Sequence, residues 1–228
     1  LYLLEGEHLV EEAIKERAQI KLIVVTSNRL EDYKNLLAQT DVQVLVVSQD
    51  VFHKLSMTET TQGILAAVNI ENQAEPPCSG RIIVLDAVQD PGNLGTIIRT
   101  ADAAGFDAVV LGAGTVDLYN DKVIRSMQGS HFHIPVFQAN LQEYLPLLKE
   151  KGVQVAVTAL HRDSKDYSAL QGAIDVAIVV GNEGQGVSED VIDLGDVVVT
   201  IPMFGKAESL NVAIASALLM YKTKETKE

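Results

Sequence analysis

The sequence predicts an α/β protein in which a small N-terminal α/β sandwich precedes a larger C-terminal domain built on a parallel sheet. Short apolar runs typical of strands alternate with segments of helical periodicity along the chain. In the C-terminal part the strands are continuously apolar, as at residues 176–180, which favours a parallel sheet covered by helices on both faces. One polar linker with two adjacent prolines, residues 73–80, separates domains at 1–72 and 81–228.

The N-terminal domain alternates helices with strands. Leu9, Val10, Ala13 and Ile14 fall on one face of a helix. The pattern then predicts a strand at 21–25, a helix at 30–39, a strand at 42–47, a short helix at 51–55 and a strand at 63–68. We expect these elements to pack as a small α/β sandwich.

The C-terminal domain repeats this alternation over a longer stretch. Its predicted strands lie at 81–85, 108–111, 153–157, 176–180 and 197–201. Its predicted helices lie at 94–104, 121–127, 141–151 and 210–222. Open parallel sheets bind ligands at the carboxyl ends of their strands, so the segments that follow these strands are the candidate sites.

The charge balance restricts the possible functions. The 18 Lys and Arg residues face 31 Asp and Glu residues, which gives a formal net charge of -13. Phosphate binding normally depends on Lys and Arg, so this balance argues against a protein that coats nucleic acid generally. A small basic patch can still bind RNA locally.

Cysteine content and hydropathy point to a cytoplasmic protein. Cys78 is the one cysteine, which excludes a disulfide framework and a site with several cysteine ligands. No apolar run approaches the ~20 residues that span a membrane, and no basic-apolar leader opens the sequence. We therefore expect a free thiol, no membrane segment and a cytoplasmic location.

The first motif follows the strand at 81–85. Asp90 is a suitable N-cap, and Pro91 suits the first helical turn. Asn93 then lies at the end of the loop, and Arg99 lies one to two turns into the helix. Taken alone, Asn93 could be a cap and Arg99 a solvated surface charge.

The second motif follows the strand at 176–180. Gly181, Gly184 and Gly186 allow the backbone to turn sharply and to approach a ligand closely. Their spacing is not that of the dinucleotide-binding fingerprint, and the Lys-Ser/Thr pair of a P-loop is absent. Taken alone, this segment could equally be a tight structural turn.

The third motif follows the strand at 197–201. Its loop, Ile-Pro-Met-Phe-Gly at residues 201–205, is apolar and rigid, and it could hold an apolar-faced ligand such as adenine. Ser209 and Asn211 then open a long apolar helix, for which Ser209 could be an N-cap and nothing more.

Together, the three motifs resemble those of the SpoU (TrmH) family of RNA ribose methyltransferases, within the knotted SPOUT class. The chain matches the family pattern at Asn93, Gly95 and Arg99, at Gly181, Glu183 and Gly186, and at Ile201, Pro202, Ser209, Leu210 and Asn211. The resemblance covers residues 81–222. Residues 4–68 more weakly resemble the small RNA-binding domain that often precedes this catalytic domain, which is similar to ribosomal proteins that bind kinked RNA.

The resemblance implies a deep trefoil knot in the C-terminal domain, with S-adenosylmethionine bound in it. Residues carried over as cofactor contacts are Gly181, Ile201 and Leu210, with their neighbours Met203 and Ser209 and the turn formed by Thr158, Ala159 and Leu160. Residues carried over as catalytic are Arg99, Asn93, Asn211, Glu183 and Ser209.

The implied reaction is methylation of a ribose 2′-hydroxyl of RNA. A guanidinium stays protonated in nearly every setting, so we expect Arg99 to hold a phosphate and stabilise the developing alkoxide rather than to act as a base. We expect Asn93 and Asn211 to orient the ribose and the loops, and Glu183 to accept backbone N–H bonds.

The resemblance also implies a homodimer and an RNA partner. Candidate RNA contacts are Arg99, Lys122, Arg125, His131 and Lys206, with Arg162 and Lys165 as weaker candidates. His131 and His133 lack a surrounding Cys/His cluster, so we expect structural or RNA-contacting roles and no metal.

Ribosomal RNA is the favoured substrate because of the leading auxiliary domain, and transfer RNA is the alternative substrate. Two different functions compete with this one: a catalytically inactive RNA-binding protein and a nicotinamide-dependent enzyme. The intact motif residues Asn93, Arg99 and Asn211 argue against the inactive protein. The absence of a Gly-rich turn after the strand at 81–85 argues against the nicotinamide enzyme.

Overall fold

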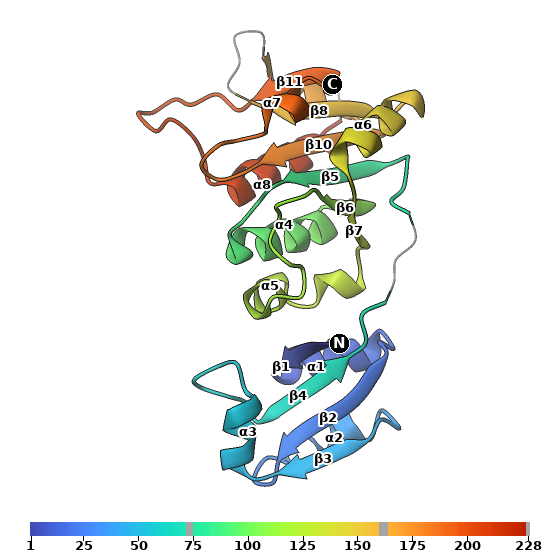
Figure 1. Ribbon diagram of the computed structural model, residues 1–228, viewed down its shortest axis with the longest axis vertical. Coiled ribbons are helices and arrows are strands. Elements are labelled where there is room, and N and C mark those ends of the chain that lie inside the picture. Colours follow the sequence, from blue (N-terminus) through green and yellow to red (C-terminus); the bar gives the residue numbers. More distant parts are fainter. Residues whose placement is uncertain (72–74, 160–163, 227–228) are drawn as a thin grey trace.

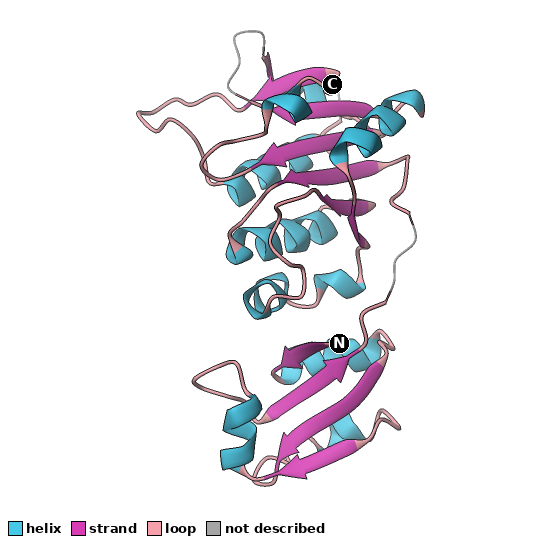
Figure 2. Ribbon diagram, viewed as in Figure 1, coloured by secondary structure: helices cyan, strands magenta, loops and turns pink. Residues whose placement is uncertain are grey.

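A computed structural model describes residues 1–71, 75–159 and 164–226. These residues form two units, each built on its own sheet (Figures 1 and 2). We call the four-stranded sheet and its helices the N-terminal unit, and the seven-stranded sheet and its helices the C-terminal unit. Within the described ranges, no helix combines the length and the apolar character that crossing a bilayer requires.

The N-terminal unit has a mixed sheet with strand order β1-β4-β2-β3, in which β2 and β3 are parallel and the other pairs are antiparallel. Its strands are β1 (Tyr2–Glu5), β2 (Ile20–Thr26), β3 (Val44–Val47) and β4 (Ile64–Val68). Its helices are α1 (Glu7–Lys15), α2 (Lys34–Leu37) and α3 (Gln49–Leu55).

Two features of this unit differ from the prediction. The predicted helix at 30–39 is wrong at its start, because residues 27–33 form successive turns and α2 begins only at Lys34. Those turns close through short-range bonds such as Asp32 N–H to the Arg29 carbonyl. Strand β1 was not predicted, since its pairing partner β4 lies more than sixty residues further along the chain.

The C-terminal unit confirms the predicted parallel sheet. Its strand order is β7-β6-β5-β10-β8-β11-β9, and every pair is parallel. The strands are β5 (Arg81–Asp86), β6 (Ala108–Leu111), β7 (Val136–Gln138), β8 (Gln154–Thr158), β9 (Lys165–Asp166), β10 (Val176–Gly181) and β11 (Val197–Thr200). The prediction missed β7 and β9, which are the short strands at the two edges.

Helices cover both faces of this sheet. The α-helices are α4 (Pro91–Ala103), α5 (Asp121–Met127), α6 (Leu141–Glu150), α7 (Glu189–Ile192) and α8 (Val212–Lys222), and the 3-10 helices are η1 (Ser130–Phe132) and η2 (Tyr167–Leu170). Side chains of α4, α5 and α8 pack in one buried cluster, and those of α6 and α7 pack in another with the opposite side chains of the strands. This double coverage explains why the strands are apolar along their whole length.

The two units share buried apolar packing. Tyr2 and Leu4 of β1 belong to the same cluster as Val123 and Ile124 of α5. The Tyr2 hydroxyl also forms a hydrogen bond of 3.0 Å with Nε2 of His131, on η1. Burial lowers the pKa of His131 to about 4, so this imidazole is neutral. These contacts fit the structural role for the half-buried His131, and its RNA-contacting role stays a prediction.

A second histidine links the units by charge. His133 contacts Asp102 of α4 through Nδ1 at 3.0 Å and Glu12 of α1 through Nε2 at 3.2 Å. The hydrogen bond to Asp102 is the largest influence and raises the pKa of His133. Burial lowers this pKa by less, and the charge of Asp102 and the contact with Glu12 add to the rise. Glu12, Glu16 and His133 also bring three possible ligand atoms within 4.8 Å of one another, so the expectation of no metal stays a prediction.

The charge on His133 should make the link between the units depend on pH. Because folding raises its pKa above the ordinary 6.5, the stabilisation is complete below pH ~6.5 and is lost as the pH rises through the folded pKa. We expect His133→Gln to lower the free energy of unfolding by ~0.2–1 kcal/mol at pH 6 and by less at pH 9. Urea unfolding at both pH values measures this. The control is His53→Gln, on exposed α3, and a difference that grows from pH 6 to pH 9 would contradict the assignment.

Candidate functional site

Four adjacent strands of the parallel sheet bring the predicted site residues to one edge. The sheet order β5-β10-β8-β11 makes these strands neighbours, although β10 follows β8 in the chain. In Figure 1 the arrowheads of β5 and β10 point to the left, and the segments that follow β5, β10 and β11 gather on that side. This is the carboxyl edge, where open α/β sheets bind ligands.

The start of α4 matches the prediction from its sequence. The Asp90 side chain accepts a hydrogen bond of 2.8 Å from the Asn93 N–H, and Pro91 lies in the first turn. An N-cap carboxylate satisfies a backbone donor that would otherwise have no partner within the helix. Asn93 is therefore held in the first turn of α4, next to the loop after β10.

Three predicted residues meet in one hydrogen-bond network. The Asn93 side-chain amide donates to the Glu183 carboxylate at 3.0 Å, and the Asn211 amide donates to the Asn93 carbonyl oxygen at 2.9 Å. The Asn211 side-chain oxygen in turn caps α8 by accepting from the N–H groups of Ala213 and Ile214. The network thus joins one residue from each of the three sequence motifs.

Glu183 is held as a carboxylate by several donors. Its oxygens accept from the backbone N–H of Gln89 at 3.1 Å and of Asp90 at 3.0 Å, besides Asn93. Burial alone would raise the pKa of Glu183, but these hydrogen bonds outweigh it, and the pKa is lowered. A carboxylate with a lowered pKa and several bound donors is a poor proton acceptor, so its place fits a positioning role.

Gly181 is required by the loop after β10. A Cβ on Gly181 would lie 2.2 Å from the Val187 backbone nitrogen and 2.3 Å from the Gly186 carbonyl oxygen. Asn182 and Gly186 close this turn by exchanging backbone hydrogen bonds of 2.9 Å in both directions. Gly181 therefore has a steric reason to be glycine that is independent of any ligand.

Two further residues tie the same loops together and were missed by the sequence analysis. Asp86 accepts hydrogen bonds of 2.8 Å from both the backbone N–H and the hydroxyl of Ser188. The Asn182 amide donates to the Ala87 carbonyl at 2.9 Å. Their place in the sequence could have identified them, because Asp86 and Asn182 both lie at the carboxyl ends of adjacent strands.

The remaining predicted catalytic residues lie outside this network. Arg99 is exposed on α4, two turns beyond Asn93, and it makes no hydrogen bond or ion pair with the residues that the structure describes. Ser209 is exposed in the loop before α8, and Asn211 rather than Ser209 caps that helix. The interpretation of Ser209 as the N-cap is therefore wrong.

A hollow of about 380 Å³ gathers three of the predicted cofactor contacts. Ile201, Met203 and Leu210 line it, and Tyr167 and Leu218 are lining residues that the sequence analysis missed. Pro202 and Phe204 complete much of its apolar wall. Its volume falls within the range of small-molecule pockets, and its lining is as apolar as an adenine ring requires.

Thr158 ends β8, the strand between β10 and β11, and Ala159 follows it. The Thr158 hydroxyl donates to the Val179 carbonyl at 3.0 Å, and the Ala159 N–H donates to the Val199 carbonyl at 3.4 Å. They fix the end of β8 against both neighbouring strands, and they do not line the hollow. Leu160, predicted with them, lies outside the described residues.

The candidate RNA contacts have different surroundings. Lys122, Lys206 and Lys165 are exposed, whereas Arg125 forms an ion pair of 2.9 Å with Asp121 one helical turn away. Arg162 lies outside the described residues.

The Gly181 geometry gives a mutational prediction with a control in the same loop. Gly181→Ala forces the added Cβ into backbone atoms, so we expect a loss of ~1–3 kcal/mol in the free energy of unfolding. At Gly184 the nearest atom to an added Cβ would be the Asn182 side-chain oxygen, at 3.7 Å. Gly184→Ala should therefore be close to neutral in the same urea titration. Equal stability losses in the two variants would refute this account of the turn.

Comparison with known proteins agrees with this arrangement. The SpoU rRNA Methylase family matches residues 80–221, and the MRM3-like substrate binding domain matches residues 1–66. The chain is 46% identical over 222 residues to the 23S rRNA (guanosine(2553)-2'-O)-methyltransferase RlmP of Bacillus subtilis (strain 168). The aligned residues cover 96% of this chain and 87% of that protein.

Solved structures have the same fold. An AdoMet-bound rRNA methyltransferase from Sinorhizobium meliloti aligns with a TM-score of 0.85 and 30% identity, over 98% of this chain and 86% of that one. An RNA 2'-O ribose methyltransferase aligns with a TM-score of 0.81 and 31% identity, over 97% and 87% of the two chains. With Asn93, Glu183 and Asn211 assembled at one edge of the sheet, these matches show that the chain belongs to the SpoU rRNA methylase family.

Proposed function

We propose that this protein transfers a methyl group from S-adenosylmethionine to a ribose 2′-hydroxyl of RNA, with 23S ribosomal RNA as the substrate. The observation that carries the proposal is the Glu183–Asn93–Asn211 network, because it joins the three motifs at one ligand-binding edge. The RlmP relative acts on 23S rRNA by its name, and the leading substrate-binding domain is present in this chain. Both favour ribosomal RNA over transfer RNA.

The residues at the edge fit S-adenosylmethionine. The apolar hollow formed by Ile201, Met203 and Leu210 suits the adenine. Gly181 and Thr158 end the neighbouring strands β10 and β8, and Ala159 follows Thr158. Ser209 and the backbone beside Leu210 complete the proposed contacts. When bound, the cofactor supplies an electrophilic methyl group on a positively charged sulfur.

We assign the chemistry to Arg99. Its exposed guanidinium is free to hold an RNA phosphate with its planar donors and to stabilise the negative charge that develops on the 2′-oxygen. A C–O bond forms as the S–C bond breaks, and the hydroxyl proton passes to solvent. Asn93, Glu183 and Asn211 keep the loops in place, so positioning accounts for much of the rate.

The chain division follows the two units. Residues 1–72 bind RNA in the manner of proteins that bind kinked RNA, 73–80 connect the units, and 81–228 form the catalytic domain with a deep trefoil knot. The protein acts in the cytoplasm and requires no metal. An inactive RNA-binding protein is disfavoured because Asn93 and Asn211 keep their mutual contact.

A homodimer is supported by the surface of α8. Ile214, Leu218 and Tyr221 are 53%, 41% and 53% exposed, and their spacing places them on one side of the helix. An exposed apolar stripe on a long helix is typical of a protein interface. This stripe lies beside the cofactor hollow, which Leu218 also lines.

The Arg99 assignment and the substrate can be tested together. An unmethylated 23S rRNA transcript is incubated with labelled S-adenosylmethionine, and the methylated ribose is mapped. We expect Arg99→Lys to lower kcat by ~10²–10³-fold, because the ammonium keeps the charge but lacks the planar donors. The Kd for S-adenosylmethionine should not change. Wild-type turnover in Arg99→Lys would exclude the planar-donor role, and methylation of transfer RNA alone would exclude the proposed substrate.

The dimer has its own matched test. Ile214→Glu places a charge on the α8 stripe, so we expect light scattering at micromolar concentration to show a monomer. Leu147→Glu is the control, since Leu147 is 39% exposed on α6, and it should leave the dimer intact. A monomeric wild-type protein would refute the proposed assembly.

A further inference from the structure

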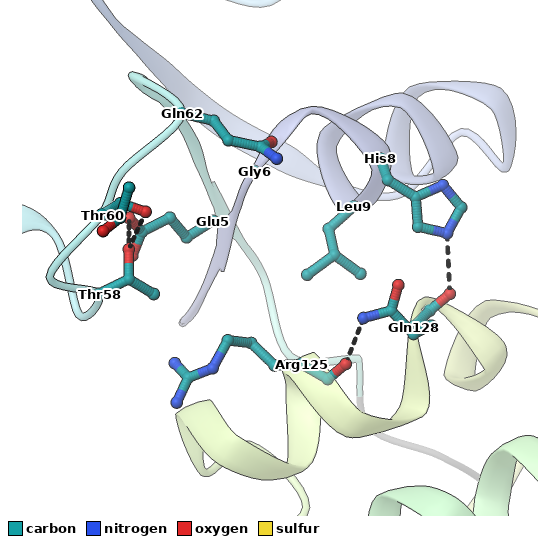
Figure 3. A pocket seen from close by; sticks show the side chains of 9 residues that line it. All are labelled: Glu5, Gly6, His8, Leu9, Thr58, Thr60, Gln62, Arg125 and Gln128. Carbon is teal, nitrogen blue, oxygen red and sulfur yellow. Dashed lines mark hydrogen bonds between the residues drawn. The ribbon is translucent and has the colours of Figure 1, made fainter.

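A second pocket lies between the two units (Figure 3). It encloses about 230 Å³ and is bounded by the corner between β1 and α1, the loop at residues 58–62, and α5 with the residue after it. Its lining combines polar side chains with the side chain of Leu9 and the bare backbone of Gly6. The proposed cofactor and catalytic residues do not line it, so this pocket is separate from the site described above.

The pocket offers hydrogen-bonding groups in a fixed arrangement. The Gln62 side-chain oxygen accepts a hydrogen bond of 2.7 Å from the Glu7 N–H, which leaves the Gln62 amide nitrogen as a donor. The Gln128 amide nitrogen donates to the Arg125 carbonyl, which leaves the Gln128 side-chain oxygen as an acceptor. A hydrogen bond of 3.3 Å from the His8 ring to the Gln128 carbonyl joins the two walls.

Positive charge comes from Arg125. One guanidinium nitrogen is paired with Asp121 at 2.9 Å, and the other nitrogens have no protein partner among the described residues. Figure 3 shows this guanidinium at the Thr58 side of the pocket, away from Gln128. The pocket therefore has a cationic donor at one end and an amide acceptor at the other.

The acidic group in the lining is already occupied. The Glu5 carboxylate accepts hydrogen bonds from the hydroxyls of Ser56 and Thr58, at 2.6 and 2.7 Å, and from the Met57 N–H at 2.9 Å. Burial would raise the pKa of Glu5, but these hydrogen bonds outweigh it and lower the pKa. Glu5 thus holds the loop at 58–62 in place and presents few free lone pairs to an incoming ligand.

The pocket wall packs closely against the helix that carries Arg99. A Cβ on Gly95 of α4 would lie 2.8 Å from the Val123 carbonyl oxygen of α5 and 2.9 Å from the Met127 nitrogen, so the backbones of the two helices lie close together there. Gly95 lies between Asn93 and Arg99 in sequence. In Figure 1 the loop at 56–63 and the segments after β5 and β11 all lie on the left side of the molecule.

We propose that this pocket binds an unpaired nucleotide of the RNA substrate, outside the nucleotide that is methylated. The inference rests on the proposed function, because it assumes an RNA substrate. Sequence-specific RNA recognition commonly takes bases that are turned out of a loop and hydrogen-bonded along their edges. The Gln62 donor and Gln128 acceptor match such an edge, Leu9 offers an apolar contact for the ring, and Arg125 matches the adjoining phosphate.

This assignment explains why the pocket contains residues of both units. A nucleotide held there contacts α1 and the loop at 58–62 on one side and α5 on the other. Because the two units are already packed together, a nucleotide held there has a set position relative to the catalytic helix, and this determines which ribose reaches Arg99. The pocket thus selects the substrate, while Arg99 acts on the ribose.

Two substitutions test the pocket. Arg125→Gln removes the charge and Gln62→Ala removes the amide donor. We expect each to weaken binding of an unmethylated 23S rRNA transcript by about five- to twentyfold in filter binding. Arg125→Gln should also reduce the salt dependence of binding by about one unit of slope, whereas Gln62→Ala should not. Arg125→Lys, which keeps the charge, should restore part of the affinity.

Controls separate this proposal from the proposed function. Lys151→Gln removes a charge from the exposed end of α6 and should leave RNA binding within about twofold of wild type. The Kd for S-adenosylmethionine and the melting temperature should be unchanged in Arg125→Gln, which excludes misfolding as the cause. If wild type methylates the transcript and both pocket variants bind it normally, the pocket proposal is wrong. If wild type methylates no RNA, the proposed function itself is wrong.

Discussion

The Glu183 carboxylate accepts hydrogen bonds from three donors of the segment that follows β5, and one of them, the Asn93 amide, extends the contact to Asn211. Asn211 also caps α8, so a movement of any one loop disturbs the other two and the start of a core helix. A charged acceptor makes these bonds stronger than neutral ones. The position of Arg99 depends on this network, because α4 begins at the same contacts.

The network needs the unusual order of the strands. Because β10 lies between β5 and β8, the Gly181 loop is next to the loop after β5, although about ninety residues separate them in the chain. The close turn at Gly181 then directs Glu183 back towards α4. The absence of a side chain at Gly181 and the charge on Glu183 therefore act together. A side chain at position 181 would displace the Glu183 carboxylate.

Local patterns in the sequence predicted what depends on local physics. Apolar runs located the central strands, and the Asp90–Pro91 pair marked the start of α4, although the helix itself was predicted only from residue 94. The short edge strands β7 and β9 escaped because two or three residues carry too little periodicity to distinguish a strand from a loop. Family resemblance supplied the site residues, and it could not supply their partners.

Long-range contacts were the part that the sequence could not predict. Asp86 meets Ser188 across 102 positions, and Tyr2 meets His131 across 129. Nothing near His131 in the sequence signals that its ring is buried against the other unit, so its predicted role stayed open between structure and RNA contact. The role of such a residue depends on which residues lie next to it in space, and only the fold determines those neighbours.

The acidic balance of the chain becomes understandable when its cations are sorted by partner. Carboxylates pair with Lys15, Arg29, Lys34, Arg125, Lys149 and Lys222. Arg99, Lys122 and Lys206 form none of the ion pairs found among the described residues. At long range, a protein with a net charge of -13 is repelled by the negative charge of RNA. Affinity has to come from short-range contacts, which favours recognition of a folded RNA shape over indiscriminate binding to phosphates. A methyltransferase that must select one ribose within a very large RNA gains specificity from this distribution, because non-specific sites hold it weakly.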